Sequence, residues 1–297
     1  MQYLYSLISF ALGPFSPHSY SVRSVQTSGD LPLYALAYAP VVHLYSQETF
    51  WPSEPSVHLE HVTAKLEGFS NDTSAPFPLT VSNLNYAGSR ESVYLTGDDN
   101  VEDEPEWLRS TYGKPDRGGK SVARSAIIAV DKSELIGPGY VDVFYPFFYS
   151  YNRGNSYNGS VYGDHVGDWE NIMIRFYNGK PQAVHYSQHS DGPAYTYDAT
   201  PKYSLRPIAF SAVGSHANYA TVGAHNHSAN FGYLTDHADA GPIWDVTSSY
   251  LAYWYSPGAG FVGATGNNVS GSWLDFVGHW GDEQYPDSDP RQASLEG

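Results

Sequence analysis

Residues 168–189 read DWENIMIRFYNGKPQAVHYSQH and predict a β-hairpin. Asn178-Gly179 is the pair that a two-residue type I′ turn prefers, because both of its central residues need a positive φ. Apolar and polar residues alternate on both sides of this pair, as they do in strands with one buried face. The turn should therefore join two antiparallel strands.

The register of this hairpin predicts which side chains meet. Asp168 and Glu170 share one face of their strand with the apolar residues at every second position up to Phe176. A two-residue turn at Asn178-Gly179 places Ser187 opposite Glu170 and His189 opposite Asp168. The two carboxylates thus stand at the end of an apolar row, where a binding site is expected.

The composition predicts an all-β protein. The chain has 297 residues, of which 41% are hydrophobic and 15% aromatic, with 28 Gly and 20 Pro. Strand-like runs separated by turn residues recur along it, and helical periodicity is poor. We expect a single β-sandwich domain over residues 31–297, with long loops and a few short helices. Residues 1–30 form an N-terminal arm or a signal segment.

The charge balance excludes several partners. Asp and Glu number 31 against 15 Lys and Arg, which gives a net charge of −16. No basic stripe is evident, so nucleic acid is not an expected partner. Anionic lipid should also be repelled, unless a divalent cation or an uncharged head group mediates the contact. The chain has no cysteine and no apolar span of 18 residues, so disulfides and a transmembrane helix are not expected.

Two features bear on localisation. Residues 3–12 form a short apolar run that resembles the core of a signal peptide, without the basic residues that normally precede it. Four glycosylation sequons begin at Asn71, Asn158, Asn226 and Asn268. These features favour a secreted or vacuolar protein and leave the cytoplasm open.

The residues around Asp168 predict a cation site. Asp168 and Glu170 lie two apart on a strand, His165 lies three residues earlier, and His189 faces them in the expected register. Two carboxylates and two imidazoles suit Ca²⁺, Mg²⁺ or Mn²⁺, and less specifically Zn²⁺. The alternative is a hydrogen-bonded polar cluster that closes the end of a sheet.

This segment resembles the heptapeptide Gly-His-Arg-His-Asp-Trp-Glu of the necrosis- and ethylene-inducing peptide-like toxins. The resemblance implies a divalent cation held by His165, Asp168 and Glu170, and residues 187–190 resemble the toxin stretch that brings a further His near the cation. Asp164, Val166 and Gly167 depart from the toxin pattern. Asn152 or Asn155 stands in the region of a further toxin ligand, an Asp, which implies weak affinity for the metal.

A longer resemblance covers most of the chain, from about Leu33 to Gln292. Its motifs are Tyr38-Ala39-Pro40, Leu59-Glu60-His61, Val93-Tyr94-Leu95-Thr96, His165-Val166-Gly167-Asp168-Trp169-Glu170, Gly214-Ser215-His216-Ala217-Asn218-Tyr219-Ala220 and Gly281-Asp282-Glu283-Gln284-Tyr285-Pro286. Together they resemble the fungal and plant family of vacuolar protein sorting-associated protein 62. The resemblance implies no specific activity.

Two functions from different classes remain open. The first is a cytolysin-like or lectin-like β-sandwich with a divalent-cation site that binds a glycan or a lipid head group. Its candidate ligand-binding residues are Asn152, Asn155, Trp169, His216, Asn218 and Tyr219. The second is an enzyme of fungal secondary metabolism, a cyclase or lyase whose aromatic-lined pocket holds a small apolar molecule. The common hydrolase and phosphate-loop motifs are absent from the sequence.

Overall fold

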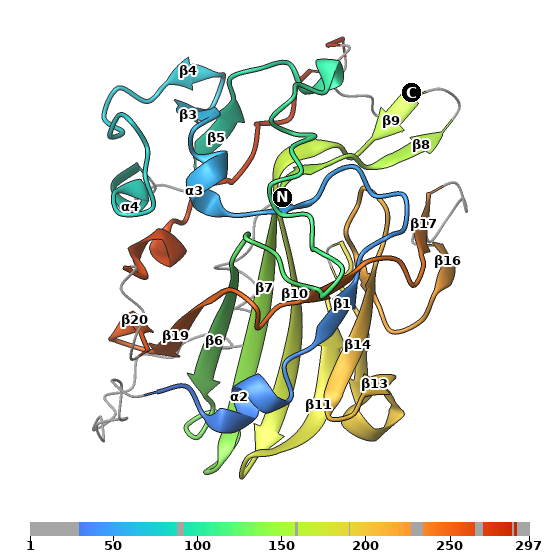
Figure 1. Cartoon of the computed structure of the whole chain (residues 1–297). Coiled ribbons are helices and arrows are strands. Elements are labelled where there is room, and N and C mark those ends of the chain that lie inside the picture. Colours follow the sequence, from blue (N-terminus) through green and yellow to red (C-terminus); the bar gives the residue numbers. More distant parts are fainter. Residues whose placement is uncertain are drawn as a thin grey trace.

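The computed structural model describes residues 30–87, 92–157, 160–189, 191–226, 234–264, 270–286 and 288–289. Strands dominate this part of the chain, which confirms the all-β prediction (Figure 1). Its α-helices are α2 (Leu33–Ala37), α3 (Pro55–His58) and α4 (Leu84–Ala87), and its 3₁₀ turns are η1 (Val101–Asp103), η2 (Tyr197–Ala199) and η3 (Ser272–Asp275). None of the helices in the described residues is long and apolar enough to cross a membrane.

The largest sheet has eight strands, seven of which follow the order β12-β11-β10-β7-β6-β19-β20, while β2 pairs with β7. The bounds are β2 (Pro52–Ser53), β6 (Ser125–Asp131), β7 (Tyr140–Asn152), β10 (His165–Tyr177), β11 (Lys180–Tyr186), β12 (Ala194–Thr196), β19 (Tyr250–Ser256) and β20 (Gly260–Gly263). The long strands β7 and β10 lie at its centre. From Asp142 onward every residue of β7 is buried, which indicates that both faces of this sheet are covered.

A five-stranded sheet covers one face. It consists of β13 (Lys202–Tyr203), β14 (Arg206–Ser211), β1 (Val41–His43) and β18 (Ile243–Asp245) in that order, with β15 (Asn218–Tyr219) paired to β14. The other face meets a three-stranded sheet made of β4 (Ser70–Asn71), β3 (Val62–Leu66) and β5 (Val93–Gly97). Two ribbons complete the described strands: β8 (Asn155–Tyr157) with β9 (Ser160–Tyr162), and β16 (Gly223–Asn226) with β17 (Thr235–Ala238).

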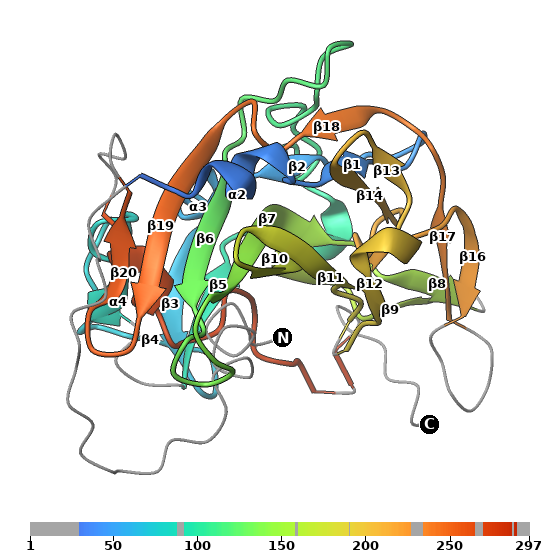
Figure 2. The same cartoon turned by 90° about the horizontal axis from the view of Figure 1, so that it is seen from below.

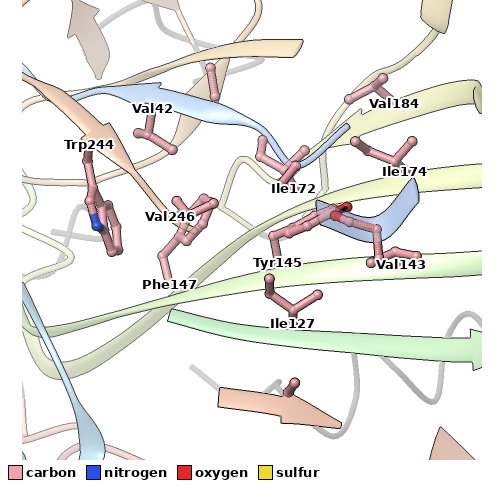
Figure 3. Close-up of a cluster of buried hydrophobic side chains, with 14 of the residues drawn as sticks. Val42, Ile127, Val143, Tyr145, Phe147, Ile172, Ile174, Val184, Trp244 and Val246 are labelled. Carbon is pink, nitrogen blue, oxygen red and sulfur yellow. Dashed lines mark hydrogen bonds between the residues drawn. The ribbon is translucent and has the colours of Figure 1, made fainter. Parts of the chain in front are cut away.

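The large sheet lies between the two smaller sheets (Figure 2) and carries an apolar core on each face. Between the two larger sheets, Val42 and Trp244 face Tyr145, Phe147 and other fully buried residues (Figure 3). On the opposite face Trp280, η3 and the three-stranded sheet pack against alternate residues of the same central strands. The sandwich prediction is confirmed, and the second core adds a third layer to it.

The predicted hairpin forms β10 and β11. Asn178 and Gly179 have φ values of 47° and 74°, as the type I′ turn requires, and Tyr177 pairs with Lys180. The predicted faces are also correct, because the row from Ile172 to Phe176 lies in the core between the two larger sheets.

The register beyond the turn corrects the prediction by one residue. Arg175 pairs with Ala183, so Gln182 forms a bulge. The bulge follows Pro181, whose missing N–H cannot complete the ladder. As a result Ser187 donates its backbone N–H to Asn171, rather than lying directly opposite Glu170.

The domain prediction stays a prediction. Asp30 is the first described residue, so the arm or signal segment expected over residues 1–30 lies almost wholly outside the described residues.

Candidate functional site

The polar end of β10 lies in the interior, between the large sheet and the segment from Ser211 to Tyr219. Asp168 and Glu170 are only 1% and 4% exposed. They meet polar residues from two distant parts of the chain, Ser187 and the segment that carries His216 and Asn218, and Glu48 lies beside His216 from a third. The long range of these contacts shows that the tertiary fold assembles the cluster.

His216 and Asp168 form a buried pair. His216 Nδ1 lies 2.9 Å from Asp168 Oδ2, and its Nε2 lies 3.1 Å from the carbonyl oxygen of Phe50. Both ring nitrogens of His216 are therefore engaged by oxygen atoms of the protein interior. The imidazole also stacks on the ring of Tyr149 with 3.7 Å between the centroids. This packing fixes the ring but leaves no route to it for a reactant.

Glu48 accepts hydrogen bonds from backbone amides of two loops beside this pair. Its Oε1 accepts the N–H groups of Thr49 and Phe50 at 2.8 Å, and its Oε2 accepts that of Gly214 at 2.9 Å. His216 Nε2 lies 3.9 Å from the same Oε2. The carboxylate thus holds the loop after β1 against the loop that carries His216. Nothing local in the sequence marks Glu48, so the sequence analysis missed it.

Glu170 differs from its neighbours in its protonation. Burial, together with the negative charge of Asp168, raises the pKa of the Glu170 carboxyl well above its usual value. Ser187 Oγ donates to Glu170 Oε2, and Asn218 Nδ2 approaches the same atom at 3.5 Å. The fold therefore favours the protonated form of Glu170.

Asp236 organises a second polar cluster. Its Oδ2 accepts from Tyr219 and pairs with His189, each at 2.7 Å, and its Oδ1 accepts from Ser215 at 2.7 Å and from Asn155 at 3.2 Å. Burial alone would raise the pKa of Asp236, but the bonds from its partners hold it below its usual range. This arrangement joins β15, β17 and the loop after β11.

The predicted cation ligands are divided among different partners. His189 pairs with Asp236 rather than facing Asp168, because β11 ends at Tyr186 and the chain then turns, with backbone hydrogen bonds exchanged between Gln188 and Asp191. His165 accepts instead from Asn152 across the ladder, at 3.0 Å, and burial lowers the pKa of its imidazole. Among the described residues, no three His, Asp or Glu side chains form a group that could hold a metal ion. The polar-cluster alternative describes this region.

Trp169 points to the other face of β10 and lines a hollow. The hollow is shallow and open to solvent, and it is lined by Glu54, Pro55, Ser56, Val81, Arg124, Ser125, Ala126, Trp169, Leu251 and Trp273. The ring of Trp169 stacks on that of Trp273 at 5.7 Å. Its indole Nε1 is buried and has no hydrogen-bond partner among the residues that the structure describes.

A fixed ion pair stands at the edge of this hollow. Arg124 Nε donates to Glu54 Oε2 at 2.6 Å, and Tyr112 donates to Glu54 Oε1 at 2.6 Å. Burial and the Glu54 carboxylate raise the pKa of the Tyr112 hydroxyl to about 12, so it stays a donor. The sequence analysis found Trp169 but missed Glu54, Arg124 and Trp273, which come from distant parts of the chain.

The comparisons with known proteins identify the family. The family described as vacuolar protein sorting-associated protein 62 matches residues 31–292. The chain belongs to this family. In Saccharomyces cerevisiae it is similar to putative vacuolar protein sorting-associated protein TDA6, 34% identical, and to vacuolar protein sorting-associated protein 62, 33% identical. Each alignment covers 91% of this chain but only 64% and 63% of the relatives, so the chain spans less than two thirds of their length.

Solved structures with partial likeness are toxins. One is described as "NLPPya in complex with mannosamine", with a TM-score of 0.34, 11% identity, and coverage of 74% of this chain and 72% of that one. Another is necrosis and ethylene inducing protein 2 from the causal agent of cocoa's witches' broom disease, with a TM-score of 0.33, 13% identity, and coverage of 67% and 71%. These distant likenesses do not enter the functional argument.

Proposed function

We propose that this protein binds a carbohydrate in the hollow beside Trp169. The observation that carries the proposal is the juxtaposition of two stacked tryptophans with the Glu54–Arg124 ion pair. A sugar ring has apolar C–H faces and a rim of hydroxyl groups. Indole rings suit the faces, and fixed charged groups suit the hydroxyls.

The polar groups of the hollow are held in place before a sugar binds. Glu54 and Arg124 hold each other in place, so a ligand pays little ordering entropy to meet them. The Nε1–H of Trp169 is a buried donor for which the described residues supply no hydrogen-bond partner. The Glu54–Arg124 pair offers hydrogen-bonding groups that suit the hydroxyls of a sugar and that a small apolar molecule would not use.

The buried clusters do not favour the enzyme alternative. His216 and Asp168 form an acid–base type of pair, but they are 0% and 1% exposed. The names of the yeast relatives suggest that this sugar recognition serves the vacuolar route, where glycosylated cargo would be the ligand. We therefore propose a binding module that acts in a secreted or vacuolar setting.

Glycan-array screening followed by calorimetric titration with the best sugar tests the proposal. Trp169→Ala should weaken binding about tenfold or more, because it removes the stacking surface. The matched control is Trp254→Ala, which removes another partly buried tryptophan that packs on the opposite face of the same sheet. The proposal fails if no sugar binds, or if the two variants lose the same affinity.

Divalent cations form a separate arm of this experiment. The titration is repeated with a chelator and with added calcium or magnesium. Binding through the Glu54–Arg124 pair needs no metal ion, so the affinity should be the same in all three conditions. A loss of binding with the chelator would favour the cation-dependent site expected from the sequence.

A further inference from the structure

A basic loop stands out from this acidic molecule. Residues 114–120, here called the basic loop, contain Lys114, Arg117 and Lys120, all exposed, in a chain with a net charge of −16. In Figure 2 the green segment that leads into β6 projects beyond β18. Within the described part of the chain, none of the three side chains forms an ion pair, and Lys114 Nζ lies 4.6 Å from the centre of the Trp51 ring.

The shape of the basic loop is fixed by its own backbone. Asp116 Oδ1 accepts the N–H groups of Gly118 at 2.8 Å and Lys120 at 3.0 Å, and the Asp116 N–H donates to the carbonyl of Lys120. Gly119 accepts the backbone N–H of Asp245, which ties the loop to β18. The cations are therefore presented on a preformed surface, so binding pays little to order the loop.

The acidic groups that touch the basic loop are already engaged. The Asp116 carboxylate accepts the two loop amides just described, and Asp245 pairs with Arg206 at 2.6 Å. Within residues 114–120 the three cations outnumber the single carboxylate of Asp116. Salt screens charges beyond a Debye length of about 10 Å at 0.1 M, so at close range the loop acts independently of the acidic groups farther away.

Exposed apolar side chains flank these cations. Val122 is 62% exposed and Ile243 is 40% exposed. A methyl carbon of Ile243 lies 3.3 Å from the position that a Cβ on Gly119 would take, so Ile243 sits against the basic loop between Arg117 and Lys120. The combination of lysine, arginine and aliphatic side chains matches the boundary between lipid head groups and acyl chains.

We propose that the basic loop, with Val122 and Ile243, docks on an anionic lipid surface. The phosphates and carboxylates of the lipid head groups would meet the three cations, while the two aliphatic side chains enter the interfacial layer. A nucleic acid would meet the cations alone and leave the aliphatic side chains exposed to water, so the surface favours lipid. This docking uses residues outside the Trp169 hollow and does not depend on sugar binding.

Vesicle flotation of the full chain tests this docking. The vesicles contain either phosphatidylcholine alone or phosphatidylcholine with about a third phosphatidylserine, and the protein should float with the second kind only. Arg117→Glu and Lys120→Glu should each weaken partitioning about tenfold, because each replaces an attraction with a repulsion. Val122→Ser should weaken it about threefold through lost apolar burial.

Lys180→Glu is the control, because it makes the same change of charge at an exposed lysine beside the hairpin turn. It should leave partitioning within a factor of two of the parent. Equal binding to both vesicle types, no binding to either, or an equal loss in Lys180→Glu and Lys120→Glu would overturn the proposal. The proposal would also be overturned if the protein bound a DNA duplex or an acidic peptide tightly but did not bind the vesicles. The loop variants leave Asp116 and the backbone groups that it bonds unchanged, so the shape of the loop should be kept. Circular dichroism checks that the variants fold.

Discussion

At the scale of single residues, the fold keeps neighbouring carboxyl groups in different protonation states. Asp236 receives hydrogen bonds from His189, Ser215, Tyr219 and Asn155 and stays ionised, whereas Glu170 is deprived of water beside Asp168 and keeps its proton. The number of donors that each carboxyl meets therefore sets its charge.

The raised pKa of Glu170 predicts how stability depends on pH. Above about pH 4.3 the unfolded chain releases this proton while the folded chain keeps it, so Glu170 lowers the stability of the fold as pH rises. Glu170→Gln is neutral in both states and still accepts from Ser187. Relative to the parent, the variant should gain free energy of unfolding as the pH rises from 5 to 8, by up to about 1.4 kcal/mol for each pH unit over which folded Glu170 keeps its proton. Urea unfolding at the two pH values measures this change.

Glu134→Gln serves as the control for this experiment, since Glu134 is exposed. Its effect on the free energy of unfolding should be the same at both pH values. If Glu170→Gln behaved like Glu134→Gln, the neutral state assigned to Glu170 would be wrong.

At the scale of elements, two glycines set how closely β10 approaches the C-terminal segment. Gly167 has a φ of 69°, and a Cβ there would overlap the carbonyl of Trp280; a Cβ on Gly281 would likewise overlap the carbonyl of Val166. The two backbones therefore touch where the large sheet meets the Trp280 segment. This close approach explains why Gly167 occupies the position at which the toxin heptapeptide has its second His.

Alanine substitutions at two glycines separate the cost of a steric clash from the cost of a positive φ. Gly167→Ala should destabilise the protein by roughly 3 kcal/mol or more, because backbone atoms have to move. Gly163→Ala tests the φ cost alone, since Gly163 has a φ of 77° and a Cβ there meets nothing within 4 Å. That cost is roughly 1–2 kcal/mol. Denaturant midpoints compare the two, and equal losses would contradict the close approach.

At the scale of the whole molecule, the large sheet joins two cores into one structure. Consecutive residues of β6 serve opposite faces: Ile127 packs between the two larger sheets, and Ile128 packs toward Trp280. Both are fully buried. Because the central strands belong to both cores, neither core can separate without breaking the sheet.

This arrangement predicts a single unfolding transition. Ile127→Ala and Ile128→Ala should each lower the free energy of unfolding by about 2–5 kcal/mol, the range for truncating a buried isoleucine. Each should shift the far-ultraviolet and near-ultraviolet circular dichroism curves together. Two separated transitions in either variant would show that the cores unfold independently.

The sequence by itself determined the features that depend on local pattern. Alternation and turn residues predicted the all-β class, and Asn178-Gly179 predicted the hairpin tip and the faces of β10. These properties follow from backbone preferences and from the two-residue period of a strand, which act over a few positions. The prediction missed the shift of the hairpin register because it did not include the bulge that follows Pro181.

Only the tertiary structure decided which polar side chains meet. Asp168 contacts His216, which is 48 residues away in the sequence. His189 contacts Asp236, which is 47 residues away. Glu54 and Arg124, separated by 70 residues, reach the hollow that Trp169 lines. Such contacts depend on how the sheets stack and how their connecting loops return. A buried carboxylate accepts whichever donor the packing brings within about 3 Å, and no local spacing encodes that donor.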